Sequence, residues 1–279
     1  MRRAARAIAF FALSQAIAIG QEKNRFDLFH PTPEALMREM ETDRPDKTES
    51  PITVDAGHYQ LEMDFASYTF DQSKHERKTA WAIAPVNLKI GVLNNLDLQL
   101  VVETYNSEKT TDRDTGRTER ASGFGDVRLR AKYNFWGNEG GPTAFAVMPF
   151  LKLPTASRDL GNGAVEGGVI LPLLFRLPAD CELATQLEID QARNADRGGY
   201  HQEVVNAVTF SHDFTKRLAG YVEVFSAISN ERHAGWVATF DCGLTYRLSA
   251  NVQVDTGVNV GLTEAADDLN PFVGLSVRY

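Results

Sequence analysis

The chain has 279 residues, with 29 basic and 37 acidic side chains and a formal net charge of −8. An acidic protein repels polyanions, so this balance excludes nucleic acid as an expected partner. Two cysteines are too few for a disulfide scaffold, and no stretch after the N-terminal region reaches the roughly 18 to 20 apolar residues of a membrane-spanning helix. These observations do not exclude a membrane β-barrel, because its strands need apolar residues on only one face.

The first predicted element is a leader at residues 1–20. Three arginines within the first six positions precede an apolar run over residues 7–13, and the small residues Ala16 and Ala18 follow. This order is typical of a secretory signal peptide, with an amphipathic N-terminal helix as the alternative. Its removal takes away three basic residues and no acidic ones, so 26 minus 37 gives a mature charge of −11. The sequence therefore predicts an exported protein.

Residues 21–56 form a polar segment with four prolines, predicted as an extended periplasmic lead-in with at most a short helix over residues 33–41. Within its TDRPDKTESP stretch, Asp43 and Asp46 lie on either side of Arg44. We interpret this stretch as a connection stiffened by proline. A plug over a barrel mouth and a periplasmic docking epitope are the alternatives.

Twelve strands separated by turn residues are predicted after this segment. Their ranges are 57–70, 79–89, 96–105, 124–135, 143–152, 165–176, 181–190, 201–212, 218–229, 236–248, 252–260 and 271–279. Connections after even-numbered strands are short, whereas those after odd-numbered strands are mostly longer, above all residues 106–123. Short turns on one side and longer loops on the other are typical of outer-membrane barrels. The pattern predicts an all-β fold, a transmembrane antiparallel up-and-down β-barrel over residues 57–279, rather than a soluble all-β domain.

Alternation along each strand assigns side chains to the lipid or to the lumen. In the strand 96–105, Leu96, Leu98 and Leu100 share one face, while Asp97 and Gln99 share the other. The same alternation directs these charged side chains into the lumen as selectivity candidates: Glu62, Asp64, Asp97, Glu103, Arg128, Arg130, Lys132, Glu188, Asp241, Arg247 and Asp255. Charged rings select solutes in channels, but facing acids and bases can also pair and plug the interior. Twelve strands lie between the roughly eight that close on packed side chains and the 16 to 18 that leave a water channel, so we expect a narrow or gated lumen.

Aromatic residues cluster at the predicted strand ends. Tyr133 and Trp136 lie at the end of one strand, Trp236 opens another, and Tyr279 ends the last. Such positions suit the interfacial girdles of a membrane barrel. We expect the last strand to pair with the first, which leaves no free edge in lipid, and to carry the signal that the outer-membrane assembly machinery recognises.

Several segments together resemble a known family. They are LMREMETDRPDKTESPITVDAGHYQLEMDF (residues 36–65), GVLNNLDLQL, GFGDVRLRAKYNFWG, VQVDTGVNVGLT and the strand that ends at Tyr279. The chain resembles the bacterial outer-membrane family of meta-pathway phenol-degradation proteins, also called transporters. The resemblance implies a barrel in the cell outer membrane, surrounded by its lipid bilayer, that passes small solutes, aromatic or hydrophobic ones among them.

The sequence contains none of the common motifs of enzyme active sites. The six histidines are scattered, and HExxH, CxxC and GxSxG patterns are missing. We therefore predict no catalytic residue, no metal and no cofactor. The alternatives are a non-conducting structural or docking barrel and, less favoured, a lipid-active enzyme with a Ser–His pair assembled across the barrel wall.

Overall fold

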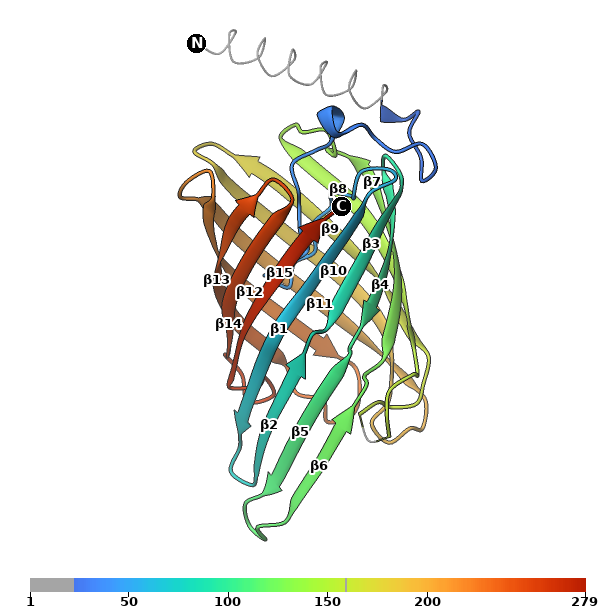
Figure 1. Cartoon of the computed structure of the whole chain (residues 1–279). Helices are drawn as coiled ribbons and strands as arrows, with labels where there is room; N and C mark the ends of the chain where they lie inside the picture. Colours follow the sequence, from blue (N-terminus) through green and yellow to red (C-terminus); the bar gives the residue numbers. More distant parts are fainter. Residues whose placement is uncertain (1–22, 159) are drawn as a thin grey trace.

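The computed structural model describes residues 23–158 and 160–279, so the predicted signal peptide at residues 1–20 lies outside the described part. Antiparallel strands form one closed barrel (Figure 1), because the last strand pairs with the first. The 3-10 turn η1 (Glu34–Leu36) precedes the barrel. Within the described residues, no helix is long and apolar enough to cross a membrane.

The described residues contain fifteen strands, several of them halves of longer ones. They are β1 (Tyr59–Gln72), β2 (Glu76–Ile83), β3 (Val86–Leu93), β4 (Leu96–Val102), β5 (Tyr105–Asp112), β6 (Thr118–Gly123), β7 (Val127–Trp136), β8 (Thr143–Leu153), β9 (Glu166–Leu177), β10 (Cys181–Arg193), β11 (Tyr200–Asp213), β12 (Leu218–Ser229), β13 (Val237–Ser249), β14 (Val252–Gly261) and β15 (Leu269–Arg278).

Three interruptions divide single spanning strands in two. β2 and β3 both pair with β1 and are separated only by Ala84 and Pro85, where proline lacks the N–H that a strand ladder needs. The Thr104 hydroxyl bridges this break by donating to the carbonyls of Ile83 at 2.6 Å and Ala84 at 2.7 Å. β4 likewise continues into β5 and β6 into β7, with residues 103–104 and 124–126 between the halves. Merging these halves gives twelve spanning strands, so the predicted fold class and strand number are confirmed.

The region predicted as a long loop, residues 106–123, instead forms most of the β5–β6 hairpin. Asn106 pairs with Gly123 and Thr111 with Thr118, and the hairpin projects beyond the rest of the barrel (Figure 1). The prediction was wrong here because the hairpin is polar on both faces. Polar residues on both faces remove the apolar alternation by which a strand is recognised.

Burial is inverted relative to a water-soluble protein. Asp97 is fully buried and Gln99 nearly so, while their neighbour Leu98 is 47% exposed. The same inversion appears on β7, where Lys132 is buried and Leu129 is exposed. A belt of exposed apolar side chains around a polar interior matches a barrel surrounded by lipid and not a soluble sandwich.

The predicted girdle residues all lie on the outer surface. Tyr133, Trp136, Trp236 and Tyr279 are exposed, and the two indole N–H groups donate to Thr143 and Ser226 hydroxyls. Tyr279 is also tied to the first strand, since its N–H donates to the Tyr59 carbonyl at 2.8 Å. Their role as an interfacial girdle stays a prediction.

Candidate functional site

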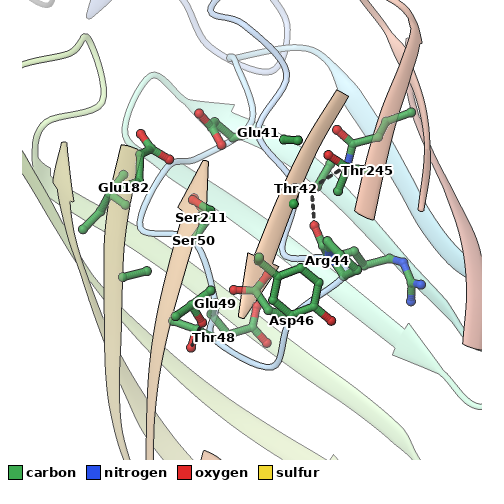
Figure 2. Close-up of a pocket in the computed structure, with 18 of the residues that line it drawn as sticks. Glu41, Thr42, Arg44, Asp46, Thr48, Glu49, Ser50, Glu182, Ser211 and Thr245 are labelled. Carbon is green, nitrogen blue, oxygen red and sulfur yellow. Dashed lines mark hydrogen bonds between the residues drawn. The ribbon is translucent and has the colours of Figure 1, made fainter. Parts of the chain in front are cut away.

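The lumen is occupied by the lead-in. Residues 38–56 descend from the rim that carries the short turns, which is the periplasmic end of such barrels, turn inside the barrel and return (Figures 1 and 2). Met40, Asp43, Thr48 and Ile52 are buried in this segment. The lead-in therefore supplies much of the material that fills the barrel.

Side chains of the wall bind the irregular backbone of the lead-in. The N–H of Val54 donates to Asp97, and the N–H groups of Lys47 and Thr48 donate to Glu223. The N–H of Glu49 donates to the Gln186 amide oxygen at 2.8 Å. A backbone without secondary structure survives at membrane depth only where its polar groups find partners. Inward carboxylates and amides thus act as acceptors for this segment.

An ionic cluster around Asp43 is deeply buried in the site. Asp43 contacts the ammonium groups of Lys132, at 2.6 Å, and of Lys89. Lys89 also lies 2.5 Å from Glu62. Burial alone would raise the pKa of Asp43, but the two lysines outweigh it and hold the pKa well below its ordinary value. Asp43 therefore stays ionised and joins the lead-in to β1, β3 and β7.

Arg44 forms the next attachment. Its guanidinium lies 2.6 Å from Asp64 on β1 and 2.7 Å from Asp255 on β14, and it stands over the ring of Phe272 at 5.6 Å. The two carboxylates come from opposite ends of the barrel sequence. Arg44 therefore connects β1 to β14 across β15, the strand that closes the barrel by pairing with β1.

A third attachment lies at the periplasmic mouth. Asp55 is paired with Lys23 at 2.8 Å and Arg38 at 3.3 Å, and Arg278 lies 3.8 Å away. Arg38 also contacts Glu139 in the turn before β8 at 2.6 Å. The opposing charges of Arg38 and Lys23 lower the pKa of Asp55 in spite of its burial. Both arms of the lead-in are thus joined to each other and to the rim.

Residues 46–50, called the tip below, reach furthest into the lumen. Lys47 lies 3.1 Å from Asp241 and 4.5 Å from the centre of the Phe225 ring. The Thr48 hydroxyl donates to Glu223 at 2.6 Å, and Glu49 accepts from Arg130 at 2.5 Å. The tip therefore contacts β7, β10, β12 and β13 at once.

Most of the predicted selectivity candidates contact the lead-in. Those that do are Glu62, Asp64, Asp97, Arg130, Lys132, Asp241 and Asp255, with Arg247 lying 3.3 Å from Glu39 at the mouth. Three others lie away from it: Arg128, Glu103, which accepts from Asn106, and Glu188, which accepts from Gln186. Charge pairing inside the lumen is present, but much of it joins the wall to the lead-in. A role of these residues in selectivity stays a prediction.

Several wall residues of this site were not among the sequence candidates, Lys89 and Gln186 among them. Lys89 holds the centre of the ionic cluster, and Gln186 binds the tip. A signal for Lys89 existed, since alternation in VNLKIGVL places it opposite the apolar Leu88 and Ile90. Gln186 is uncharged, so it was not among the charged side chains that the alternation directs inward.

A cavity of about 140 Å³ remains between the lead-in and strands β9 to β14. Figure 2 shows Glu41, Asp46 and Glu49 on the lead-in side, with Glu182 on β10 and Ser211 on β11 across from them. Further small residues line the wall: Ala184, Ala219, Gly220 and Thr245. The volume of this cavity is close to the roughly 150 Å³ of cavities that accommodate one benzene ring.

These features define the class of protein. A closed twelve-stranded barrel with an apolar outer belt and a polar interior is an outer-membrane β-barrel, and the bilayer of the outer membrane is its environment. The chain belongs to the family described as "Putative MetA-pathway of phenol degradation", whose model matches residues 42–279.

The chain is similar to several solved structures. The COG4313 outer membrane channel from Pseudomonas putida F1 matches with a TM-score of 0.62 at 12% identity, covering 86% of this chain and 100% of that one. The CymD monoaromatic hydrocarbon channel matches with a TM-score of 0.43 at 9% identity, covering 79% of this chain and 87% of that one. The KdgM porin matches with a TM-score of 0.43 at 12% identity, covering 77% and 98%. A comparison with curated proteins returned no match.

Proposed function

We propose that the protein is a passive outer-membrane channel for small compounds, aromatic or hydrophobic ones among them, and that the lead-in narrows its lumen. One observation carries this proposal. Within the described residues, every hydrogen bond between residues 38–54 and the strands involves a side chain, so this part of the lead-in does not belong to the sheet. Its displacement leaves the strand ladder intact and opens a polar, hydratable lumen.

The inner wall supports the proposed solute class. On β8 and β9 the inward side chains are largely apolar and buried: Ala144, Ala146, Met148, Ile170 and Leu174. Apolar surface beside a hydratable path accommodates an aromatic ring better than a wholly charged wall does. The structural relative with a TM-score of 0.62 is named an outer membrane channel, which agrees with the proposal.

The selectivity candidates divide by position under this proposal. Arg128 and Glu188 project into the lumen beyond the tip, where an incoming solute meets them first. Arg130 and Lys132 act mainly by holding the lead-in. The protein acts without catalysis, and its last strand is the part that the assembly machinery recognises.

The test is conductance in a planar bilayer. We expect the mature protein to show small, intermittent currents and a variant lacking residues 21–56 to show larger, steady ones. Heat-modifiable migration in gels and a β-rich circular dichroism spectrum would verify that the variant is folded. Silence of both folded proteins would reject the channel.

The filled lumen specifically favours one other candidate, a non-conducting structural or docking barrel. Such a barrel would not conduct with or without the full β5–β6 hairpin. Shortening the hairpin would instead impair binding or assembly. Conductance that changes with the hairpin would exclude it.

A further inference from the structure

The lead-in is attached unequally around the barrel. Asp43 and its lysine partners fix it to β1, β3 and β7, where the side chains of Asp43, Lys89 and Lys132 are at most 4% exposed. Around the cavity, β10 to β13 present several small side chains, such as Ala184, Ser211 and Ala219, between larger ones such as Glu182 and Tyr221. This cavity therefore lies on the side of the lead-in that faces β9 to β14.

The tip forms the inner end of this cavity. The hydroxyls of Thr48 and Thr209 lie 2.9 Å apart, and Glu49 bridges Gln186 and Arg130. All of these residues except Arg130 line the cavity or contact the tip from β10 and β11. A solute that enters the cavity from the lumen must displace these contacts, together with those that Lys47 and Thr48 make with Glu223 and Asp241.

We propose that solutes pass between the lead-in and strands β10 to β13, and that only the tip moves aside while the Asp43 cluster and the Asp55 attachment stay in place. This inference rests on the channel function proposed above. It makes Thr48 and Glu49 the narrowest point of the path, and Ser211 and Ala219 its wall.

The charges explain why the tip yields first. Glu49 and Arg130 are each 12% exposed and Lys47 is 31% exposed, so water reaches these side chains when the tip opens, whereas Asp241 and Glu223 on the wall are buried. Separating Asp43 from two fully desolvated lysines leaves uncompensated buried charge, which costs far more. Pro45 and Pro51 border the tip, and their restricted φ angles confine the motion to the residues between them.

Two matched crosslinks in the full-length protein test this, in a background with Cys181→Ser and Cys242→Ser. Thr48→Cys with Thr209→Cys locks the tip. Thr53→Cys with Asn138→Cys locks the returning arm, where the two native side chains are 2.8 Å apart. We expect oxidation of the tip pair to abolish conductance, a reductant to restore it, and the arm pair to conduct in both states.

Loss of conductance in both oxidised pairs would overturn the inference, because the whole lead-in would then have to move. Persistent conductance through the oxidised tip pair would also overturn it. Silence of the reduced proteins and of the background would instead reject the channel function itself.

A single-thiol measurement covers the case in which a pair fails to fold. Ser211→Cys in the same background is treated with a charged methanethiosulfonate from the periplasmic side. We expect at least a threefold fall in conductance, with no change in the treated background. Complete modification by mass spectrometry without a change in conductance would place the path elsewhere and overturn the inference.

Discussion

In two sectors of the barrel wall, side chains alternate between lumen and lipid in the same way, but the two sectors bind the lead-in differently. The charged sector, on β1, β3, β4 and β7, directs four buried charges inward: Glu62, Lys89, Asp97 and Lys132. The small-residue sector, on β8 to β11, directs mainly apolar or small side chains inward: Ala144, Met148, Ile170, Ala184 and Ala207. Buried charges require partners, and the lead-in supplies them, whereas apolar side chains do not. Attachment is therefore dense in the charged sector and sparse on β8 to β11, while Glu223 on β12 and Asp241 on β13 hold the tip.

The largest effect is expected from the charged sector. Asp43→Asn leaves Lys89 and Lys132 without their shared carboxylate, and breaking a buried ion pair from one side costs about 3 to 5 kcal/mol. We expect the lead-in to leave the lumen, with faster tryptic cleavage after Lys47 and larger currents. Asp27→Asn is the control, because the Asp27 side chain is exposed and contacts His30. Equal cleavage rates in both variants would contradict an ionic anchor.

A smaller effect is expected where the lead-in meets the small-residue sector. Ile52 packs in a buried cluster with Ala144, Leu174 and Ala184. Ile52→Ala removes this packing at a cost of about 2 kcal/mol, the lower end for such truncations, since water can enter the space. Tryptic cleavage after Lys47 should accelerate, but less than with Asp43→Asn. A larger acceleration than that of Asp43→Asn would reverse the comparison between the two sectors.

The sequence predicted the barrel better than it predicted the content of its lumen. Alternation placed Asp97 inward and Leu98 outward because a strand repeats every two residues, and this holds without knowledge of partners. The position of the lead-in depends on contacts such as Arg44 with Asp255, 211 residues apart, made by a segment without periodicity. No sequence pattern indicated the cavity either, because it exists where the small side chains of Ser211 and Ala219 leave space unfilled.

The smallest expected effect is a pH dependence that arises at the tip. Burial raises the pKa of Glu49 to about 7, although Arg130 acts in the opposite direction. Burial and the nearby Glu223 likewise raise the pKa of Asp46. Once the tip is released into water, both carboxyls regain their ordinary lower values. The docked tip therefore binds protons more tightly than the released tip does.

The direction of the effect follows from this difference. Docking is most stable below pH 4.5, the ordinary pKa of a glutamate, and loses stability as the pH rises through about 7. We expect the open fraction to increase a few-fold between pH 5.5 and pH 8, measured as mean current in a planar bilayer. Glu49→Gln should flatten much of this increase, while Glu34→Gln, an exposed lead-in position, should preserve it. An open fraction that falls with rising pH, or an unchanged slope in Glu49→Gln, would show that the tip does not control the passage.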